Sequence, residues 1–196
     1  DNGKVEDFLQ TIQNSERKKE ILKEVAGLAL LPDFPIDKAP VLYGEGSNGK
    51  NKFVELLDKI SGTYHSINLE DYTGDDFASA EVENTTLVFF DEFQDIDSPS
   101  KLKSFIGSDK IRVRHMQQEG YMAEQIALPV LAANELPTPP EQKTSFFRRW
   151  EVIDFPYKFT AAENDGNKDM LSDEEIEMRY WTDQALNCFA SKAVRK

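Results

Sequence analysis

The sequence predicts an α/β domain with a mainly parallel central sheet. Short runs of β-branched and aromatic residues recur along the 196-residue chain, as in strands that are buried on both faces of a parallel sheet. A glycine-rich turn follows the first run and opens a segment with the apolar spacing of a helix. Helical spacing also precedes the first run, and an alternation of helices with buried strands is typical of layered α/β folds.

Residues 1–36 are expected to form a helical segment ahead of the sheet. Apolar residues at positions 5, 8, 9 and 12 follow the spacing of an amphipathic helix, and positions 21, 22, 25 and 28 continue it. Pro32 and Pro35 end this region. We expect a pair of helices that packs on the following core, as part of a linker or collar region.

The core is expected to span residues 37–158. Ala39–Tyr43 is a short apolar run, Thr85–Phe90 is continuously β-branched and aromatic, and Ala127–Ala132 is a third such run. These three runs predict buried strands of a parallel sheet. Val152–Pro156 is a candidate for the last strand of the sheet.

A β-hairpin is predicted between the second and third runs. Ile111–His115 alternates apolar and polar residues, and a second short segment follows the turn-like stretch Met116–Gly120. Beyond the core, residues 159–196 are expected to contain an acidic loop within 161–177. A single final helix is expected around residues 173–192.

The composition is that of a folded protein with an ordinary core, at 39% hydrophobic and 30% charged residues. No apolar run approaches the roughly 18 residues of a membrane span, so we expect no membrane partner. The start Asp-Asn-Gly-Lys shows neither a signal peptide nor an initiator Met, which suggests a piece of a longer chain. The single cysteine, Cys188, leaves no intramolecular disulfide framework and favours a reducing compartment. We therefore expect a cytoplasmic location, in the host cell or at a viral replication site.

The charge distribution is uneven. The net charge of −13 argues at first against nucleic acid, which favours basic surfaces. However, residues 63–100 hold ten acidic side chains and no lysine or arginine, whereas residues 101–150 hold eight lysines and arginines against five carboxylates. The whole-chain charge does not describe such a surface, so the basic segment keeps nucleic acid open as a partner.

A phosphate-binding loop is predicted between the first strand and the following helix, where the sequence nearly matches G-x-x-x-x-G-K-[ST]. Its residues are Gly44, Glu45, Gly46, Ser47, Asn48, Gly49, Lys50 and Asn51. Glycines let successive backbone N–H groups point inward at phosphate oxygens, and the helix N-terminus adds its positive dipole end. Lys50 would bridge the β- and γ-phosphates of ATP. The alternative is a glycine turn with a chance lysine.

One position departs from the loop pattern. Asn51 stands where a Ser or Thr would supply a hydroxyl to Mg²⁺. A carboxamide oxygen can ligate a hard cation, but its reach and angle differ. Nucleotide binding is expected to survive this change more readily than hydrolysis.

A second carboxylate site is predicted at Asp91 and Glu92, which follow the second apolar run. The carboxyl ends of strands are where α/β sheets place their ligands. Asp91 would join the Mg²⁺ shell, and Glu92 would polarise the attacking water. The alternative is a solvated acidic loop that also includes Asp95 and Asp97.

Three further residues are candidates for a sensor and an arginine finger. Asn134 ends the third apolar run, where an amide beside the γ-phosphate could hold the attacking water; the alternative is a turn-forming asparagine. Arg148 and Arg149 precede Trp150. An arginine that reaches a neighbour's γ-phosphate would stabilise the transition state. The alternative is surface charge or an arginine stacked on Trp150.

In order and spacing, these motifs resemble a superfamily 3 helicase domain of the poxvirus, phage and plasmid primase–helicase type, an AAA+-like P-loop ATPase. The resemblance runs from about Glu24 to Phe155. It rests on Ala26–Pro32, Leu42–Lys50, Phe90–Glu92, Leu102–Lys103 with Gly107–Asp109, Ala132–Pro137, and Phe147–Trp150 with Asp154–Pro156. The hairpin between the second acidic motif and the sensor distinguishes this family from most other P-loop ATPases.

The resemblance implies a three-layer fold and a homo-hexameric ring that binds ATP and Mg²⁺ between subunits. One subunit would supply Lys50, Asp91, Glu92 and Asn134. The next would supply Arg148 or Arg149; the sequence leaves the choice open, and we favour Arg149. The resemblance also implies a primase domain in the same longer chain.

In the family, the hairpin lies in the ring channel and grips single-stranded DNA. The positions here that match are Lys110, Arg112, Arg114, His115 and Gln117. The hairpin tip carries no lysine or arginine, so phosphate contacts would fall on the flanking cations or on tip amides. His115 could equally be an ordinary surface histidine.

Two functions follow from these expectations. The first is an ATP-driven DNA helicase motor of a viral, phage or plasmid replication protein. The second is a nucleotide-binding assembly module with weak or no hydrolysis, because Asn51 replaces the Mg²⁺-binding hydroxyl. A P-loop kinase suits the sequence less well, because an asparagine sensor followed by an arginine pair is typical of ring ATPases.

Overall fold

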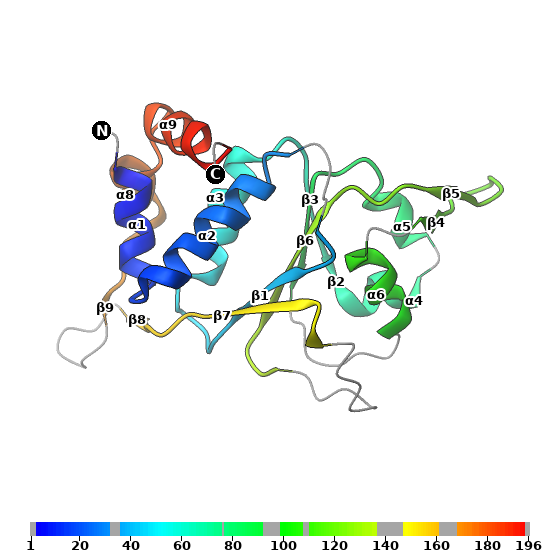
Figure 1. Cartoon of the computed structure of the whole chain (residues 1–196), viewed down its shortest axis with the longest axis horizontal. Coiled ribbons are helices and arrows are strands. Elements are labelled where there is room, and N and C mark those ends of the chain that lie inside the picture. The colour runs from blue at the N-terminus through cyan, green and yellow to red at the C-terminus, as the bar shows by residue number, and fades with distance from the viewer. Residues whose placement is uncertain are drawn as a thin grey trace.

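Five parallel strands form the central sheet of the computed structural model, in the order β2-β3-β6-β1-β7 (Figure 1). The structure describes residues 3–31, 36–75, 77–91, 99–107, 110–136, 147–160 and 168–194. The strands of this sheet are β1 (Ala39–Tyr43), β2 (Tyr64–Asn68), β3 (Leu87–Asp91), β6 (Leu128–Ala133) and β7 (Trp150–Asp154). The predicted α/β class with a mainly parallel sheet is confirmed.

Helices flank the sheet on both faces (Figure 1). They include α1 (Lys4–Ile12), α2 (Glu16–Leu28), α3 (Lys50–Ile60), α4 (Leu69–Gly74), α5 (Ala78–Glu81), α6 (Pro99–Ile106), α8 (Asp173–Tyr180) and α9 (Asp183–Ala193). The predicted N-terminal helix pair is present as α1 and α2. The buried side chain of Gln13 closes the junction between them, because its amide donates to the backbone oxygen of Asp154 at 2.8 Å.

The strands bury both of their faces, which explains the continuous apolar runs in the sequence. In β3, Leu87 and Phe89 join one hydrophobic cluster, whereas Val88 and Phe90 join the other. The first cluster contains side chains from α1, α2, α3, α8 and α9. The second contains side chains from α4, α5 and α6. The sheet is therefore the middle of three layers.

β1 has the predicted bounds, the ends of the other predicted strands differ by one or two residues, and β2 was missed. Thr85 and Thr86 precede β3, and Thr86 N–H donates to the backbone oxygen of Thr63 at 3.1 Å. β7 starts at Trp150, two residues earlier than expected. β2 is an edge strand with a largely half-buried or exposed pattern, so it lacks the apolar run that marks the central strands.

The C-terminal region contains two helices, so the expectation of one final helix was wrong. α8 ends at Tyr180, and α9 begins after Thr182, whose side-chain oxygen accepts a hydrogen bond from the Ala185 N–H at 3.4 Å. Phe8 of α1 packs on the rings of Tyr180 and Trp181, with centroids 5.8 and 5.6 Å away. The two ends of the chain thus share the first hydrophobic cluster with the core.

The predicted hairpin is present as β4 (Ile111–Val113) and β5 (Tyr121–Ala123), which pair antiparallel. It projects from the end of the molecule farthest from α1 and α8 (Figure 1). Its first strand ends at Val113, so Arg114 and His115 lie in the connection rather than in the strand.

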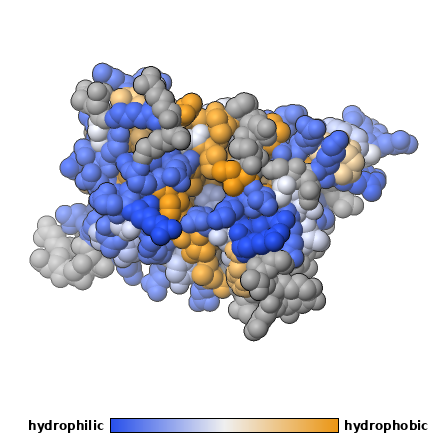
Figure 2. Space-filling model, in the orientation of Figure 1, coloured by the Kyte–Doolittle hydropathy of each residue, from blue (hydrophilic) through white to orange (hydrophobic). Residues whose placement is uncertain are grey.

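The surface carries apolar residues in a band over the middle of one face, between polar ends (Figure 2). In the described ranges, no helix combines the length and apolar character that crossing a membrane requires.

A substitution at Gly27 tests the packing of the chain ends. A Cβ on Gly27, inside α2, would lie 2.7 Å from the backbone oxygen of Ala193 in α9. Alanine normally stabilises a helix relative to glycine by about 1 kcal/mol, but here overpacking dominates, at a cost of about 1–3 kcal/mol. We expect Gly27→Ala to lower the free energy of unfolding in urea denaturation.

The matched control is Gly74→Ala, because a Cβ on Gly74 at the end of α4 meets nothing within 4 Å. It should be neutral or slightly stabilising. Equal stability of Gly27→Ala and the parent protein would show that α9 does not pack on α2 as described.

Candidate nucleotide-binding site

The glycine-rich loop connects β1 to α3 and has the backbone that its glycines allow. Gly44 has a φ of 146° and Gly49, the N-cap of α3, has a φ of 92°, conformations that residues with a Cβ rarely adopt. A Cβ on Gly49 would also lie 2.6 Å from Cγ2 of Ile12. A Cβ on Gly46, by contrast, would meet nothing within 4 Å. The loop is packed on its inner side and open on the other.

Lys50 lies at the centre of the loop, buried and surrounded by acceptors. Its Nζ donates to the backbone oxygen of Gly44, to Oδ1 of Asn134 at 2.9 Å and to the backbone oxygen of Ala133 at 3.4 Å. Burial lowers the pKa of Lys50 below the ordinary lysine value, while the negative charge of Asp91 acts in the opposite direction. The ammonium therefore links the loop to the end of β6.

Asp91 and Asn134 come from neighbouring strands of the sheet. Asp91 ends β3 and Asn134 follows β6, so both lie at the carboxyl edge, where the loop follows β1. Both line the same cavity as Lys50. The structure thus brings together Lys50, Asp91 and Asn134, although Lys50 and Asn134 are 84 positions apart in the sequence.

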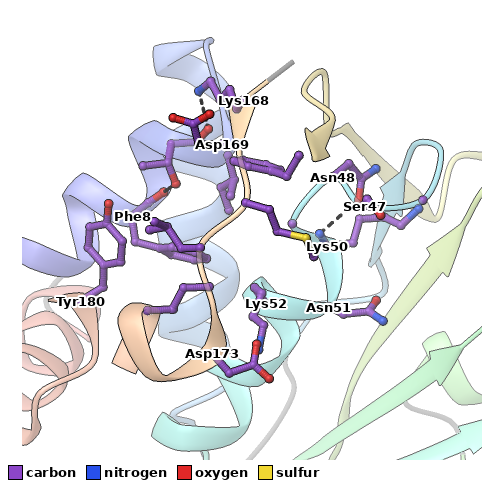
Figure 3. Close-up of a pocket in the computed structure, with 18 of the residues that line it drawn as sticks. Phe8, Ser47, Asn48, Lys50, Asn51, Lys52, Lys168, Asp169, Asp173 and Tyr180 are labelled. Atoms are coloured by element: carbon purple, nitrogen blue, oxygen red, sulfur yellow. Dashed lines mark hydrogen bonds and ion pairs between the residues drawn. The ribbon is translucent and has the colours of Figure 1, made fainter. Parts of the chain in front are cut away.

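The cavity has a volume of about 870 Å³, within the range of small-molecule sites. One wall is the loop, with Gly46–Lys52. Figure 3 shows Ser47, Asn48 and Lys50 on one side of the cavity and Phe8 and Tyr180 on the other. Asn51 is exposed and lines the cavity from the first turn of α3.

The opposite wall was missed by sequence reasoning. It consists of side chains from α1 and α8 and from residues 157–160 and 168–171, which we call the strap; the strap includes the short parallel strands β8 (Phe159–Thr160) and β9 (Lys168–Asp169). The sequence carried only a weak signal for this wall. Phe8 fits the apolar stripe of a core helix, and the strap lies in an acidic stretch without periodicity.

The strap is fastened to both neighbouring elements. The Phe159 N–H donates to the backbone oxygen of Ser47 in the loop at 2.7 Å. Lys168 Nζ donates to the backbone oxygen of Thr11 at 2.5 Å and lies 3.3 Å from the centroid of Tyr157. Burial lowers the pKa of Lys168. These contacts hold the strap across α1 and the loop.

The arginine pair lies at the opposite end of the strands, the amino edge of the sheet. Trp150 pairs with Ala39, at the start of β1, whereas the loop follows the end of β1. Five residues of extended strand separate the two edges by about 16 Å. Arg148 is exposed and Arg149 is half-buried, so neither belongs to the cavity of its own chain. Glu92, the second residue of the predicted Asp91–Glu92 carboxylate site, falls outside the described residues.

The predicted DNA-contacting residues of the hairpin differ in their contacts. Lys110 and Arg112 are exposed, as is Gln117 in the tip. The guanidinium of Arg114 lies 5.2 Å from the centroid of Phe77, and His115 Nε2 lies 3.1 Å from Oε2 of Glu83. Arg114 and His115, in the connection between the two hairpin strands, thus contact Phe77 and Glu83.

A protein-family model describes residues 42–149, more than half of the chain, as DUF5906, a family of unknown function. The chain belongs to this family. The match spans the loop, Asp91, the hairpin, Asn134 and the arginine pair. It contains β2, β3, β6 and the end of β1, and it leaves out β7 and the helices α1, α2, α8 and α9.

Known proteins extend this likeness. The chain is 27% identical over 190 residues to "Putative helicase L207/L206" of Acanthamoeba polyphaga mimivirus. The match covers 92% of this chain but only 20% of that protein. Apo structures of the NrS-1 C-terminal region match with TM-scores of 0.71 and 0.65 at 16% identity, over 97% of this chain and 44% and 42% of theirs. This chain is thus similar to a small part of a larger protein, and the name of that protein supports a helicase-like relationship.

The environment of Lys50 makes a prediction about its titration. Because the charge of Asp91 raises the pKa of Lys50 against the effect of burial, Asp91→Asn should lower that pKa further. The measurement is an NMR pH titration of the Lys50 side chain. Asp173→Asn is the matched control, since Asp173 lines the same cavity but pairs with Lys52 at 2.7 Å. A Lys50 pKa that ignores Asp91→Asn, or shifts equally in both variants, would contradict this geometry.

Proposed function

We propose that this chain is the ATP-driven motor domain of a DNA helicase from a viral, phage or plasmid replication protein. The similarity to a protein named as a helicase supports a helicase-type role. The observation that carries the proposal is the convergence of Lys50, Asp91 and Asn134 beside an open glycine-rich loop. This is the arrangement expected of a phosphate site at the carboxyl edge of an α/β sheet.

The residues present fit a nucleoside triphosphate with Mg²⁺. Lys50 and the loop N–H groups would hold the phosphates, and the N-terminus of α3 adds its positive dipole end. Asp91 and Asn51 offer oxygen ligands of the kind that Mg²⁺ prefers. The bound ion would neutralise charge that develops on the phosphates. Asn134, already 2.9 Å from Lys50 Nζ, would position the attacking water, with Glu92 polarising it.

A ring of identical subunits, a hexamer in the family that the motifs resemble, is part of the proposal. The loop and the arginine pair lie at opposite edges of one sheet, so a single chain cannot place Arg148 or Arg149 on its own phosphate site. A head-to-tail contact between copies would bring them together and, when it closes, generates a ring. An arginine supplied in trans stabilises the transition-state charge of phosphoryl transfer.

Single-stranded DNA is the proposed track, and the hairpin is its proposed contact. Lys110, Arg112 and Gln117 are exposed for this role. Arg114 is also exposed while its guanidinium lies over Phe77, whereas His115 is half-buried and bonded to Glu83. A ring repeats this weakly basic element, so avidity would replace strong binding by one subunit. A primase domain in the same longer chain, and action in the host cytoplasm or at a viral replication site, complete the proposal.

The second candidate is a nucleotide-binding assembly module. It is favoured by Asn51, whose carboxamide replaces a hydroxyl at the first turn of α3. In this case ATP would stabilise the ring without rapid hydrolysis.

Steady-state phosphate release, with and without a single-stranded oligonucleotide, separates the two functions. We expect Lys50→Ala to reduce ATP turnover about hundredfold, as losing one preorganised charge-stabilising donor does elsewhere, and Asn51→Thr to increase it. The control is Lys23→Ala, because Lys23 pairs with Glu20 at 2.7 Å and is outside the cavity. Near-normal turnover in Lys50→Ala would remove the loop from the site. Absent hydrolysis in both the parent protein and Asn51→Thr would favour the assembly module.

Mixing two inactive variants tests the shared site. Arg149→Ala and Glu92→Gln should each bind ATP yet fail to hydrolyse it. An equal mixture should recover about a quarter of the activity, because roughly one interface in four then joins an intact Glu92 to an intact Arg149. Arg148→Ala serves as the matched variant. Recovery with Arg148→Ala instead would identify Arg148 as the finger, whereas no recovery with either would argue against a trans arginine.

A further inference from the structure

The cavity extends well beyond the phosphate loop. Its far wall is formed by α1, α8 and the strap, and it combines charged side chains, Lys168, Asp169, Asp173 and Arg179, with an apolar and aromatic part. That apolar part contains Phe8, Ile12, Phe159, Met170, Ile176 and Tyr180. Phosphates would occupy only the loop side, where the backbone N–H groups and Lys50 lie. The apolar wall therefore suits a different part of a ligand, one that is flat and weakly polar.

Phe159 stands at the junction of the two sides. Its backbone N–H is bonded to Ser47 in the loop. Its ring reaches the start of α3, since Cε2 lies 3.7 Å from where a Cβ on Gly49 would be. The ring is half-buried, so part of its surface remains for a ligand. Aromatic faces of this kind stack on nucleobases without reading their sequence.

Met170 lies on the same wall at its rim, with 57% of its surface exposed. Its N–H donates to the backbone oxygen of Thr160 at 3.0 Å, which fixes it beside Phe159 on the strap. A methionine thioether is polarisable and packs favourably on rings. The strap thus presents one aromatic and one sulfur-containing side chain to the cavity.

We propose that the strap and α1 form the nucleoside subsite, with Phe159 and Met170 packing on the base and ribose of the nucleotide. This inference rests on the proposed function, because it assumes that the loop holds the phosphates. It assigns a ligand-binding role to segments at both ends of the chain, outside the residues that the family model matches. Phe159 and Met170 would contact a nucleoside, whereas a bare polyphosphate held by the loop would leave these two side chains uncontacted.

Two ligands separate the subsite from the phosphate loop. Calorimetric titration with ATP and with inorganic tripolyphosphate, each with Mg²⁺, measures binding with and without the nucleoside. The parent protein should bind ATP more tightly than tripolyphosphate. Phe159→Ala should weaken ATP binding about tenfold, within the range of base–aromatic stacking, and leave tripolyphosphate unchanged. Lys50→Ala should weaken both.

Two surface variants test the subsite in case Phe159→Ala fails to fold. Met170→Asp places a charge on the rim of the cavity without emptying the core, whereas Met178→Asp does so on α8, at a site that is 64% exposed and outside the cavity. We expect only Met170→Asp to weaken ATP binding, again by about tenfold. Both variants should melt at the same temperature as the parent protein.

The possible results distinguish a failure of the nucleoside subsite from a failure of the proposed function. If the parent protein binds neither ligand, the proposed function fails. If it binds both equally well, or if Met170→Asp and Met178→Asp bind ATP alike, the phosphate site stands and the nucleoside subsite is wrong. A loss of tripolyphosphate binding equal to that of ATP in Phe159→Ala would also overturn it, because Phe159 would then act only through the loop.

Discussion

The buried ammonium of Lys50 is the interaction on which the architecture of the site depends. A cation in this position is costly unless hydrogen-bond acceptors surround it, and the acceptors come from the loop and from the end of β6. The same ammonium carries a lowered pKa because it is buried. The loop, the sheet edge and Asn134 are therefore held in one arrangement, which is poised to exchange protein oxygens for phosphate oxygens.

The parallel sheet separates the functions along one axis. Its carboxyl edge holds the loop, Asp91 and Asn134, while its amino edge holds the arginine pair. The hairpin projects from the end of the molecule away from α1 and α8 (Figure 1). The proposed motor, whose subunits would share their sites, needs such a division, because each subunit would present a nucleotide site to one neighbour and an arginine to the other. The fold provides this polarity within a single layer of strands.

Much of this arrangement was predictable from the sequence because it depends on local chemistry. Glycines in a loop between an apolar strand and an amphipathic helix, and a polar residue at a strand end, can be recognised in a short stretch of sequence, as at Gly49 and Asn134. The strap and β2 leave no such marks. Phe159 and Met170 meet the loop through tertiary packing, and β2 is an edge strand whose pattern is only partly apolar. The break between α8 and α9 was also missed, since Trp181 caps the end of α8 and Thr182 caps the start of α9 without a proline or glycine between them.

A crystal structure of this chain with Mg²⁺ and a nonhydrolysable ATP analogue tests the central claim most directly. We expect phosphate oxygens within hydrogen-bond distance of Lys50 Nζ and of the loop N–H groups, with Asn134 beside the terminal phosphate. A saturating analogue that leaves Lys50 bonded to Gly44 and Ala133, and occupies some other surface, would contradict the account.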